Sequence, residues 1–302
     1  MALAHLHARL VHVLGERVRA NEPLARHTSY RIGGPADLLV RPDTVDELAV
    51  VLREAGTCGV RVTLLGGGSN MLVGDGGIRG VVVKLGREFR RVEWGAASVR
   101  AGAAVQLGKL ARAGVTRVLS GLEHAEGSPG TVGGALFMNA GAYGGDIAGT
   151  AEAVDGLDAS GSPLRLGRDT LAFTYRRAHL PAGFVVTAVS FGLRPEEPAA
   201  VRARLDVVRT RRVASQPQGQ PNAGSIFKNP PGDHAGRLIE AAGLKGRRVG
   251  GARLSERHAN FIVNDGRARA VDVQVLMAIA QRAVWERSGV WLEPEVRLVG
   301  SW

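Results

Sequence analysis

The sequence contains a single cysteine, Cys58, among its 302 residues. One thiol cannot form a disulfide within the chain, and it cannot supply the cysteine clusters that hold structural metal centres. We therefore expect neither an internal disulfide nor a cysteine-rich metal site. His258, in the segment RHANF, has no metal-ligating residues around it, so we expect a hydrogen-bonded structural histidine and no bound metal.

Long apolar runs are also missing. No stretch of about 18 uncharged apolar residues occurs, so no membrane-spanning helix is expected. Residues 1–18 carry charged and histidine side chains at helical spacing, and they lack the apolar block and cleavage site of a secretory signal peptide. These absences predict a cytoplasmic protein that does not associate with a membrane.

Aromatic residues make up only 5% of the chain, although its formal net charge is +11. A basic balance of this size suits nucleic acid, an anionic membrane or an anionic small molecule as a partner. Nucleic-acid binding would favour a dense basic stripe with interleaved aromatics, whereas the arginines are spread from Arg9 to Arg297. We expect mostly solvated surface charge, phosphate-bearing ligands and no nucleic acid. A non-catalytic basic protein that binds nucleotides or nucleic acid is the remote alternative.

Helical and extended segments alternate along the chain, and hydrophobic residues, at 45%, are enough for a sizeable core. A capping box of Thr44 and Glu47 begins the first helix of the alternation. The segment SQPQGQPNAGS at 215–225 is the best linker candidate, and we place a domain boundary near residue 200. The predicted helices are 44–55, 104–113, 199–212, 234–242 and 271–287. The predicted strands are 61–65, 80–85, 98–101, 151–157, 184–193, 260–264 and 291–299.

Two glycine-rich loops carry the first chemical signal. GGGSN at 66–70 follows a predicted strand, and EGSPGTVGG at 126–134 leads into a run of small residues. Glycine lets backbone N–H groups converge on a phosphate without obstruction by side chains. Two such loops in one domain suggest an extended dinucleotide. A plain hairpin turn for the first loop and a glycine-rich packing corner for the second are the alternatives.

Candidate catalytic side chains lie in three further segments. Ser225 lies in GSIFKNP, where no G-x-S-x-G elbow surrounds it, so we expect a proton donor or a simple turn serine and no hydrolase nucleophile. Arg176 follows Tyr175 and could pair with a carboxylate or stabilise developing enolate charge. Glu293 and Glu295 lie two apart on a predicted strand, hence on one face, and either could handle a proton. Taken alone, each of these charges could equally be ordinary surface charge.

These segments together resemble the UDP-N-acetylenolpyruvoylglucosamine reductases, flavoenzymes that complete UDP-N-acetylmuramate. The resemblance covers nearly the whole chain, and its motifs are collinear. They are HTSYRIGGPAD, LGGGSNML, GSPGTVGG, MNAGAYGG, TYR, AGSIFKNP, AGRLIEAAGLKG, HANFIVN and LEPEVRLVG. Two positions depart from the family pattern, because Ser128 stands where isoleucine is common and Ala178 replaces a frequent serine.

The resemblance implies an α+β fold of the FAD-binding type shared with vanillyl-alcohol-oxidase-like enzymes. Residues 1–200 would form the FAD-binding domain, as two α+β lobes at roughly 1–85 and 86–200. Residues 201–302 would form an α+β substrate-binding domain. The short stretch between Arg176 and Ser225 resembles the compact form of the family, which lacks an extra substrate-clamping loop.

The resemblance also implies cofactors and roles. FAD, held non-covalently, would be reduced by NADPH and would pass hydride to C3 of UDP-N-acetylglucosamine enolpyruvate, while Ser225 protonates C2. Arg176 and Glu295 would polarise the substrate carboxylate and stabilise the enolate-like intermediate. Lys228, Asn229 and Tyr175 would bind substrate. The residues implied for FAD are Gly66, Gly67, Gly68, Ser69, Asn70, Gly130, Thr131, Val132, Gly133 and Gly134. Another FAD oxidoreductase of the same fold is the nearest alternative.

Overall fold

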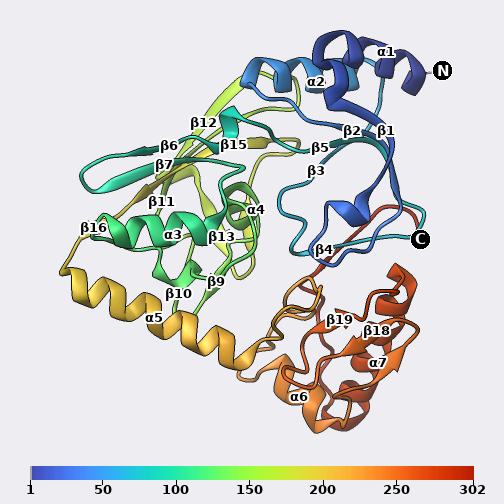
Figure 1. The fold of residues 1–302 in the computed structure, drawn as a ribbon, viewed down its shortest axis with the longest axis vertical. Helices are drawn as coiled ribbons and strands as arrows, with labels where there is room; N and C mark the ends of the chain where they lie inside the picture. The colour runs from blue at the N-terminus through green and yellow to red at the C-terminus, as the bar shows by residue number, and fades with distance from the viewer. Residues whose placement is uncertain (1) are drawn as a thin grey trace. The chain divides into compact units, whose positions relative to one another are not determined.

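A computed structural model describes residues 2–302 (Figure 1). The chain divides into two compact units. Unit 1 contains the described residues up to Ala20, together with Leu38–Gly67 and Gly80–Arg211. Unit 2 contains Asn21–Asp37, Gly68–Arg79 and Arg212–Trp302.

A five-stranded antiparallel sheet forms the larger core of unit 1. Its order is β12-β11-β15-β7-β6. The helices α3 (Leu107–Thr116) and α4 (Val132–Phe137) lie on one face of it (Figure 1) and bury Leu107, Leu110 and Leu136 against the sheet. The bounds of the strands are β12 Pro163–Gly167, β11 Ala151–Leu157, β15 Val185–Gly192, β7 Ser98–Gly102 and β6 Val92–Trp94.

A second core in unit 1 lies under α1 (Ala2–Leu14) and α2 (Val45–Thr57), which bury leucine, valine and alanine side chains spaced three or four residues apart. The accompanying four-stranded sheet has the order β1-β2-β5-β3, and its strands β3 and β5 run parallel. Its strands are β1 Val18–Pro23, β2 Pro35–Val40, β5 Ile78–Val83 and β3 Val62–Leu64. Parallel strands present their carboxyl ends at the same edge, and the first glycine loop begins at that edge.

Unit 2 contains a three-stranded antiparallel sheet, β17-β18-β19, packed with α6 (Ala235–Ala241) and α7 (Ala270–Ser288). Gly289 ends α7 in a left-handed conformation with φ of 69°. A parallel pair joins β4 (Met71–Val73) to β20 (Arg297–Val299). The sheet strands are β17 Arg248–Val249, β18 Ala252–Leu254 and β19 Ile262–Asn264.

The remaining regular elements are short, apart from α5 (Pro198–Ser215). The two-stranded pairs are β9 Gly141–Ala142 with β10 Gly145–Asp146, β13 Ala172–Thr174 with β14 Arg177–His179, and β8 Leu119–Ser120 with β16 Arg194–Pro195. Single 3-10 turns occur at Gly15–Arg17, Leu24–Arg26, Glu88–Arg90, Glu123–Ala125 and Arg168–Thr170. Within residues 2–302, no helix combines the length and apolar character needed to cross a membrane.

Most predicted elements are present within a few residues, and the strand predicted at 151–157 matches β11 residue for residue. Thr44 caps α2 as expected, because its hydroxyl accepts the N–H of Glu47 at 3.2 Å. The reciprocal half of the capping box is different. The Glu47 carboxylate accepts from the N–H of Asp43, at 2.6 Å, and pairs with Arg17 at 2.6 and 2.7 Å.

A single boundary near residue 200 does not describe two segments of the chain. Asn21–Asp37 and Gly68–Arg79 lie before that boundary but group with the C-terminal part of the chain. Long-range bonds account for this grouping. The Asp75 carboxylate accepts the N–H groups of Ala270 and Val271, at 2.8 and 3.2 Å, where α7 begins. Local sequence patterns do not predict such long-range bonds.

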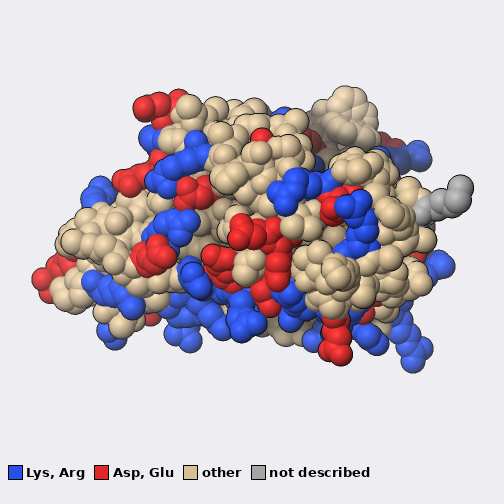
Figure 2. Space-filling view, turned by 90° about the horizontal axis from the view of Figure 1, so that it is seen from above, with Lys and Arg blue, Asp and Glu red and all other residues tan. Residues whose placement is uncertain are grey.

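Surface charge is mixed. Figure 2 shows acidic side chains among the lysines and arginines on the face that it draws. Paired charges are common within unit 1, where Asp155 accepts from both Arg100 and Arg165, at 2.9 and 2.7 Å. Exposed pairs of this kind contribute little to stability. They do compensate part of the basic excess locally.

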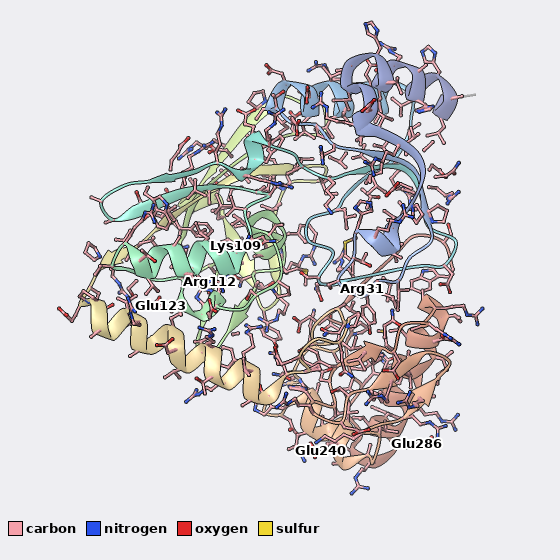
Figure 3. All side chains as sticks on the ribbon, viewed as in Figure 1. Arg31, Lys109, Arg112, Glu123, Glu240 and Glu286 are labelled. Atoms are coloured by element: carbon pink, nitrogen blue, oxygen red, sulfur yellow. The ribbon has the colours of Figure 1, made fainter. Side chains whose placement is uncertain are left out.

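One ion-pair network in unit 1 is better shielded. Glu123 is 8% exposed and lies between α3 and α5 (Figure 3). Its carboxylate accepts from Arg204 of α5 at 2.9 Å and from the N–H of Gly121 at 2.7 Å. Burial opposes ionisation of Glu123 more than any single contact favours it, yet the hydrogen bonds from Gly121, Arg204 and Ser120 together lower its pKa. Glu123 therefore anchors α5 in its ionised form.

We predict that Glu123→Gln lowers the free energy of unfolding at neutral pH by about 2 kcal/mol, because a buried charge-assisted bond is lost. A depressed pKa stabilises the fold above the unfolded pKa, here the ordinary 4.5, and this contribution disappears as the pH falls through the folded pKa. Chemical denaturation over a pH series measures the difference. Glu196→Gln, at the more exposed partner of Arg204, should cost less. A wild-type advantage that stays constant down to about pH 3 would contradict this account.

A second prediction concerns Tyr30, which is fully buried in the unit 2 core and whose hydroxyl has no hydrogen-bond partner within residues 2–302. Burial raises its pKa well above the usual range. An unsatisfied buried hydroxyl costs about 1–3 kcal/mol, so Tyr30→Phe should leave the free energy of unfolding unchanged or increase it. Tyr175→Phe, at a 52% exposed tyrosine, is the control and should leave the free energy of unfolding unchanged. Denaturant unfolding decides, and a clear loss of stability in Tyr30→Phe would show that the hydroxyl is satisfied.

Candidate functional site

The two predicted glycine loops meet in unit 1. A Cβ atom on Gly66 would lie 2.7 Å from the hydroxyl oxygen of Thr131, and one on Gly67 would lie 3.1 Å from the carbonyl oxygen of Pro129. A side chain at Gly66 would require the Thr131 hydroxyl to turn away, and one at Gly67 would require the Pro129 carbonyl to shift slightly. The small size of glycine therefore favours this close approach of the two loops.

The backbone N–H groups where these two loops meet, a region that we call the cradle, fall into two groups. Val132 and Gly133 donate to the carbonyl oxygens of Val105 and Ala103, both at 2.9 Å, so these N–H groups hold the second loop in place. By contrast, the N–H groups of Gly66, Gly67, Gly130 and Thr131 have no partner among the described residues of unit 1. Free backbone N–H groups on two loops that approach closely suit an anionic diphosphate, which makes the cradle a candidate site for the phosphate part of a dinucleotide.

The rest of the first loop belongs to unit 2. Gly68 has φ of 60°, and a Cβ there would come within 2.5 Å of the His27 carbonyl oxygen. Asn70 uses its side chain on the protein, because its amide donates to the carbonyl of Glu295 at 3.1 Å. Its own carbonyl accepts the N–H of Arg297 at 3.0 Å. The loop is thereby joined to the segment that carries the candidate glutamate.

Ser225 lies on a firmly held segment. The next residue, Ile226, donates its N–H to the carbonyl of Asn260 at 2.9 Å. The side-chain amide of Asn260 then exchanges two hydrogen bonds, at 2.9 and 2.8 Å, with the backbone of the buried Phe227. The Ser225 hydroxyl itself is half-buried and makes no hydrogen bond within residues 2–302. Its proton is thus uncommitted in the protein.

The segment of the two glutamates runs beside that of Ser225, but the strand predicted over 291–299 is wrong. Only β20, Arg297–Val299, is regular, because Pro294 has no N–H to donate and interrupts the ladder. The N–H of Glu295 bonds to the carbonyl of Ile226 at 2.8 Å, directly after Ser225. Ser225 and Glu295 are therefore close neighbours along two bonded stretches of unit 2.

The two glutamates flank Pro294 and differ in exposure. Glu293 has a 69% exposed side chain whose carboxylate pairs with Lys228 Nζ at 2.5 Å. Glu295 is half-buried beside the Ser225 segment. The two residues that spacing alone left equivalent therefore differ in exposure. Lys228, predicted to bind substrate, forms an ion pair here.

Arg176 and Tyr175 form the tip of a hairpin in unit 1. Thr174 of β13 pairs with Arg177 of β14, so the turn consists of these two residues alone. Arg176 has φ of 59°, a left-handed conformation that residues with side chains adopt rarely. Its guanidinium carbon lies 4.9 Å from the centre of the Tyr175 ring. Strain of this kind clusters at functional positions.

Asn229 has a structural role that the sequence analysis missed. Its side-chain oxygen accepts the N–H of Ala235 at 3.1 Å, at the start of α6, where the adjacent His234 supplies no side-chain cap. The signal was available, since asparagine is a good capping residue, but it stands six residues before the helix. His258 is hydrogen-bonded as predicted, because its Nδ1 accepts the N–H of Asn260 at 3.2 Å, and burial lowers its pKa.

Comparison with known proteins identifies the family. Residues 216–299 match the model of the UDP-N-acetylenolpyruvoylglucosamine reductase C-terminal domain, and residues 36–167 match an FAD binding domain. UDP-N-acetylenolpyruvoylglucosamine reductase 2 of Symbiobacterium thermophilum is 49% identical over 94% of this chain and 92% of its own length. The reductase of Rubrobacter xylanophilus is 47% identical over 93% of this chain and 95% of its own length.

Solved structures agree. The crystal structure of UDP-N-acetylenolpyruvylglucosamine reductase (MurB) from Thermus caldophilus superposes with a TM-score of 0.82 at 38% identity, and it covers 93% of this chain and 98% of its own. A variant of BBE-like 1 from Physcomitrella patens, at 21% identity and a TM-score of 0.50, covers 62% of this chain and 44% of its own, and shows the fold alone. The predicted FAD-binding α+β fold is confirmed. On sequence and structure together, the chain belongs to the UDP-N-acetylenolpyruvoylglucosamine reductases.

Proposed function

We propose that this chain reduces UDP-N-acetylglucosamine enolpyruvate to UDP-N-acetylmuramate with NADPH, through non-covalently bound FAD, as a step of peptidoglycan precursor synthesis in the cytoplasm. The observation that carries the proposal is the uncommitted hydroxyl of Ser225 on a rigid segment bonded to Glu295. Family membership and the cradle formed by Gly66, Gly67, Gly130 and Thr131 support the choice of substrate and cofactor.

In this proposal residues 1–200, with lobes at roughly 1–85 and 86–200, bind FAD, and residues 201–302 bind substrate. FAD, when bound, takes electrons from NADPH and supplies hydride for C3 of the enolpyruvyl group. The free N–H groups of the cradle would hold its diphosphate. Because the amides of Val132 and Gly133 are occupied, those residues would act by holding the second loop in place.

Ser225 would deliver the proton that balances the added hydride. A serine hydroxyl is a weak acid in water, whereas an enolate-like carbanion at C2 is a strong base. Transfer is feasible when the hydroxyl is placed within hydrogen-bond reach and has no competing acceptor. Ser225 meets the second condition within the protein, and the bonds at Ile226 and Phe227 limit its movement.

Arg176 would supply fixed positive charge for the substrate carboxylate as the enolate develops. A single well-placed donor of this kind lowers the barrier by about 3 kcal/mol. The strained hairpin tip restricts the direction of the side chain, and Tyr175 lies against its guanidinium. Glu295 would help to handle charge and protons at the reacting carbons. Lys228 would exchange its carboxylate partner Glu293 for the substrate diphosphate, beside Asn229.

An absorption spectrum of the purified protein tests the proposed function. We expect a yellow flavoprotein that bleaches on anaerobic addition of NADPH and recovers its colour on addition of UDP-N-acetylglucosamine enolpyruvate. A yellow protein that ignores this substrate, and turns over a sugar with oxygen, would instead indicate another FAD oxidoreductase of the same fold. A colourless protein that takes up no added FAD would refute the proposal.

The catalytic assignments predict a split between the two half-reactions. Ser225→Ala, Arg176→Ala and Glu295→Gln should retain FAD and its reduction by NADPH. Re-oxidation by the enolpyruvyl substrate should slow by at least about 100-fold in each, because only that step needs the proton and the charge stabilisation. Stopped-flow absorbance of each half-reaction measures both rates.

Glu293→Gln is the matched control, because it makes the same charge change two residues from Glu295 at an exposed side chain. At saturating substrate it should re-oxidise at the wild-type rate. Unchanged re-oxidation in Ser225→Ala would remove serine as the proton donor. Loss of bound flavin in Arg176→Ala or Glu295→Gln would mean that those residues are structural.

A further inference from the structure

The segment that contains Ser29, in HTSYRIGGPAD, has no role in the mechanism above. In unit 2 this segment lies against the first glycine loop. The N–H of Ser29 donates to the carbonyl of Gly68 at 3.2 Å. Its hydroxyl oxygen lies 2.7 Å from the carbonyl oxygen of Asn222 and 3.2 Å from that of Gly68.

A serine hydroxyl has one proton to donate, and the nearer acceptor is the carbonyl of Asn222. Gly68 already accepts the N–H of Ser29, so its carbonyl does not depend on the hydroxyl. The hydroxyl therefore ties the first glycine loop to a point three residues before Ser225. Gly224, next to Ser225, adopts φ of 75°, so this stretch is a sharp turn whose position depends on such anchors.

Asn70 makes the corresponding link to Glu295. Its side-chain amide donates to the Glu295 carbonyl at 3.1 Å, while the Glu295 N–H bonds to Ile226 at 2.8 Å. The backbone of Glu295 is thus held on one side by the glycine loop and on the other by the neighbour of Ser225. Arg297, which donates to the carbonyl of Asn70 at 3.0 Å, completes the connection into β20.

We propose that Ser29 and Asn70 are positioning residues that fix Ser225 and Glu295 relative to the first glycine loop. This inference rests on the proposed function, in which Ser225 and Glu295 act at the substrate. A single neutral hydrogen bond adds little to stability, so folding does not depend on either residue. A misplacement of about 1 Å at a reacting centre can cost about 100-fold in rate, so catalysis does depend on them.

Three variants and one control test this. Ser29→Ala removes the link to Asn222, and Asn70→Asp replaces the amide donor by an isosteric carboxylate that repels the Glu295 carbonyl. Asn70→Ala is a second substitution of Asn70, in case the added charge disturbs folding. Thr28→Val is the matched control, because Thr28 also spends its hydroxyl on a backbone carbonyl, that of Ile32 at 2.9 Å, within the same segment.

We expect Ser29→Ala and Asn70→Asp to slow re-oxidation by the enolpyruvyl substrate by about 10- to 100-fold, with FAD content, melting temperature and reduction by NADPH close to wild type. Thr28→Val should match wild type in both half-reactions. In the double variant Asn70→Asp with Glu295→Gln, re-oxidation should be hardly slower than in Glu295→Gln alone, because Asn70 acts through Glu295.

Three results would overturn the inference. They are equal slowing of both half-reactions, loss of FAD from the Asn70 variants, and full additivity of the double variant. The proposed function is judged separately. If Ser225→Ala and Glu295→Gln leave re-oxidation unchanged, that function fails; if they slow it while Ser29→Ala and both Asn70 variants do not, only the positioning role fails.

Discussion

Gly66 and Gly67 lie against the loop Pro129–Thr131, and the proposed cofactor site in unit 1 depends on this close approach of two glycine loops. A Cβ atom on either residue would meet oxygen atoms at 2.7 and 3.1 Å. The second loop cannot retreat easily, because Val132 bonds to the strand-to-helix connection before α3. A side chain at Gly66 would displace the Thr131 hydroxyl, and one at Gly67 would press on the Pro129 carbonyl, so either substitution would disturb the place where the two loops meet.

Side chains and main chain have different tasks around the first glycine loop. In unit 1 the backbone N–H groups of Gly66 and Gly67 stay free for an anion, whereas in unit 2 the side chain of Asn70 is used within the protein. In the proposal the glycines would supply the ligand contacts, because backbone donors hold a phosphate without side-chain entropy. The side chain of Asn70 links the loop to the backbone of Glu295 by a hydrogen bond. A single pentapeptide can therefore serve both binding and positioning.

The sequence predicts most of what local pattern controls and little of what distant hydrogen bonds control. Hydrophobic spacing located β11 residue for residue, and capping chemistry located the start of α2 at Thr44. The prediction of a strand over 291–299 was wrong, because it rested on residue pattern and took no account of the missing N–H of Pro294. Ser29 was not recognised because its partner, Asn222, lies 193 residues away in the chain. Collinear motifs identified the family, but only coordinates show which polar atoms are occupied.

The contrast between Glu293 and Glu295 shows why occupancy matters more than residue type at this site. Both are carboxylates near Ser225, and both could in principle handle a proton. Glu293 is exposed and pairs with Lys228, so its charge is screened by solvent and by that ammonium. Glu295 is half-buried, and its backbone is bonded on both sides. A negative charge there would oppose the charge that develops on the reacting carbons, so in the proposal the positive charge of Arg176 lowers the barrier, and Glu295 would act in proton handling.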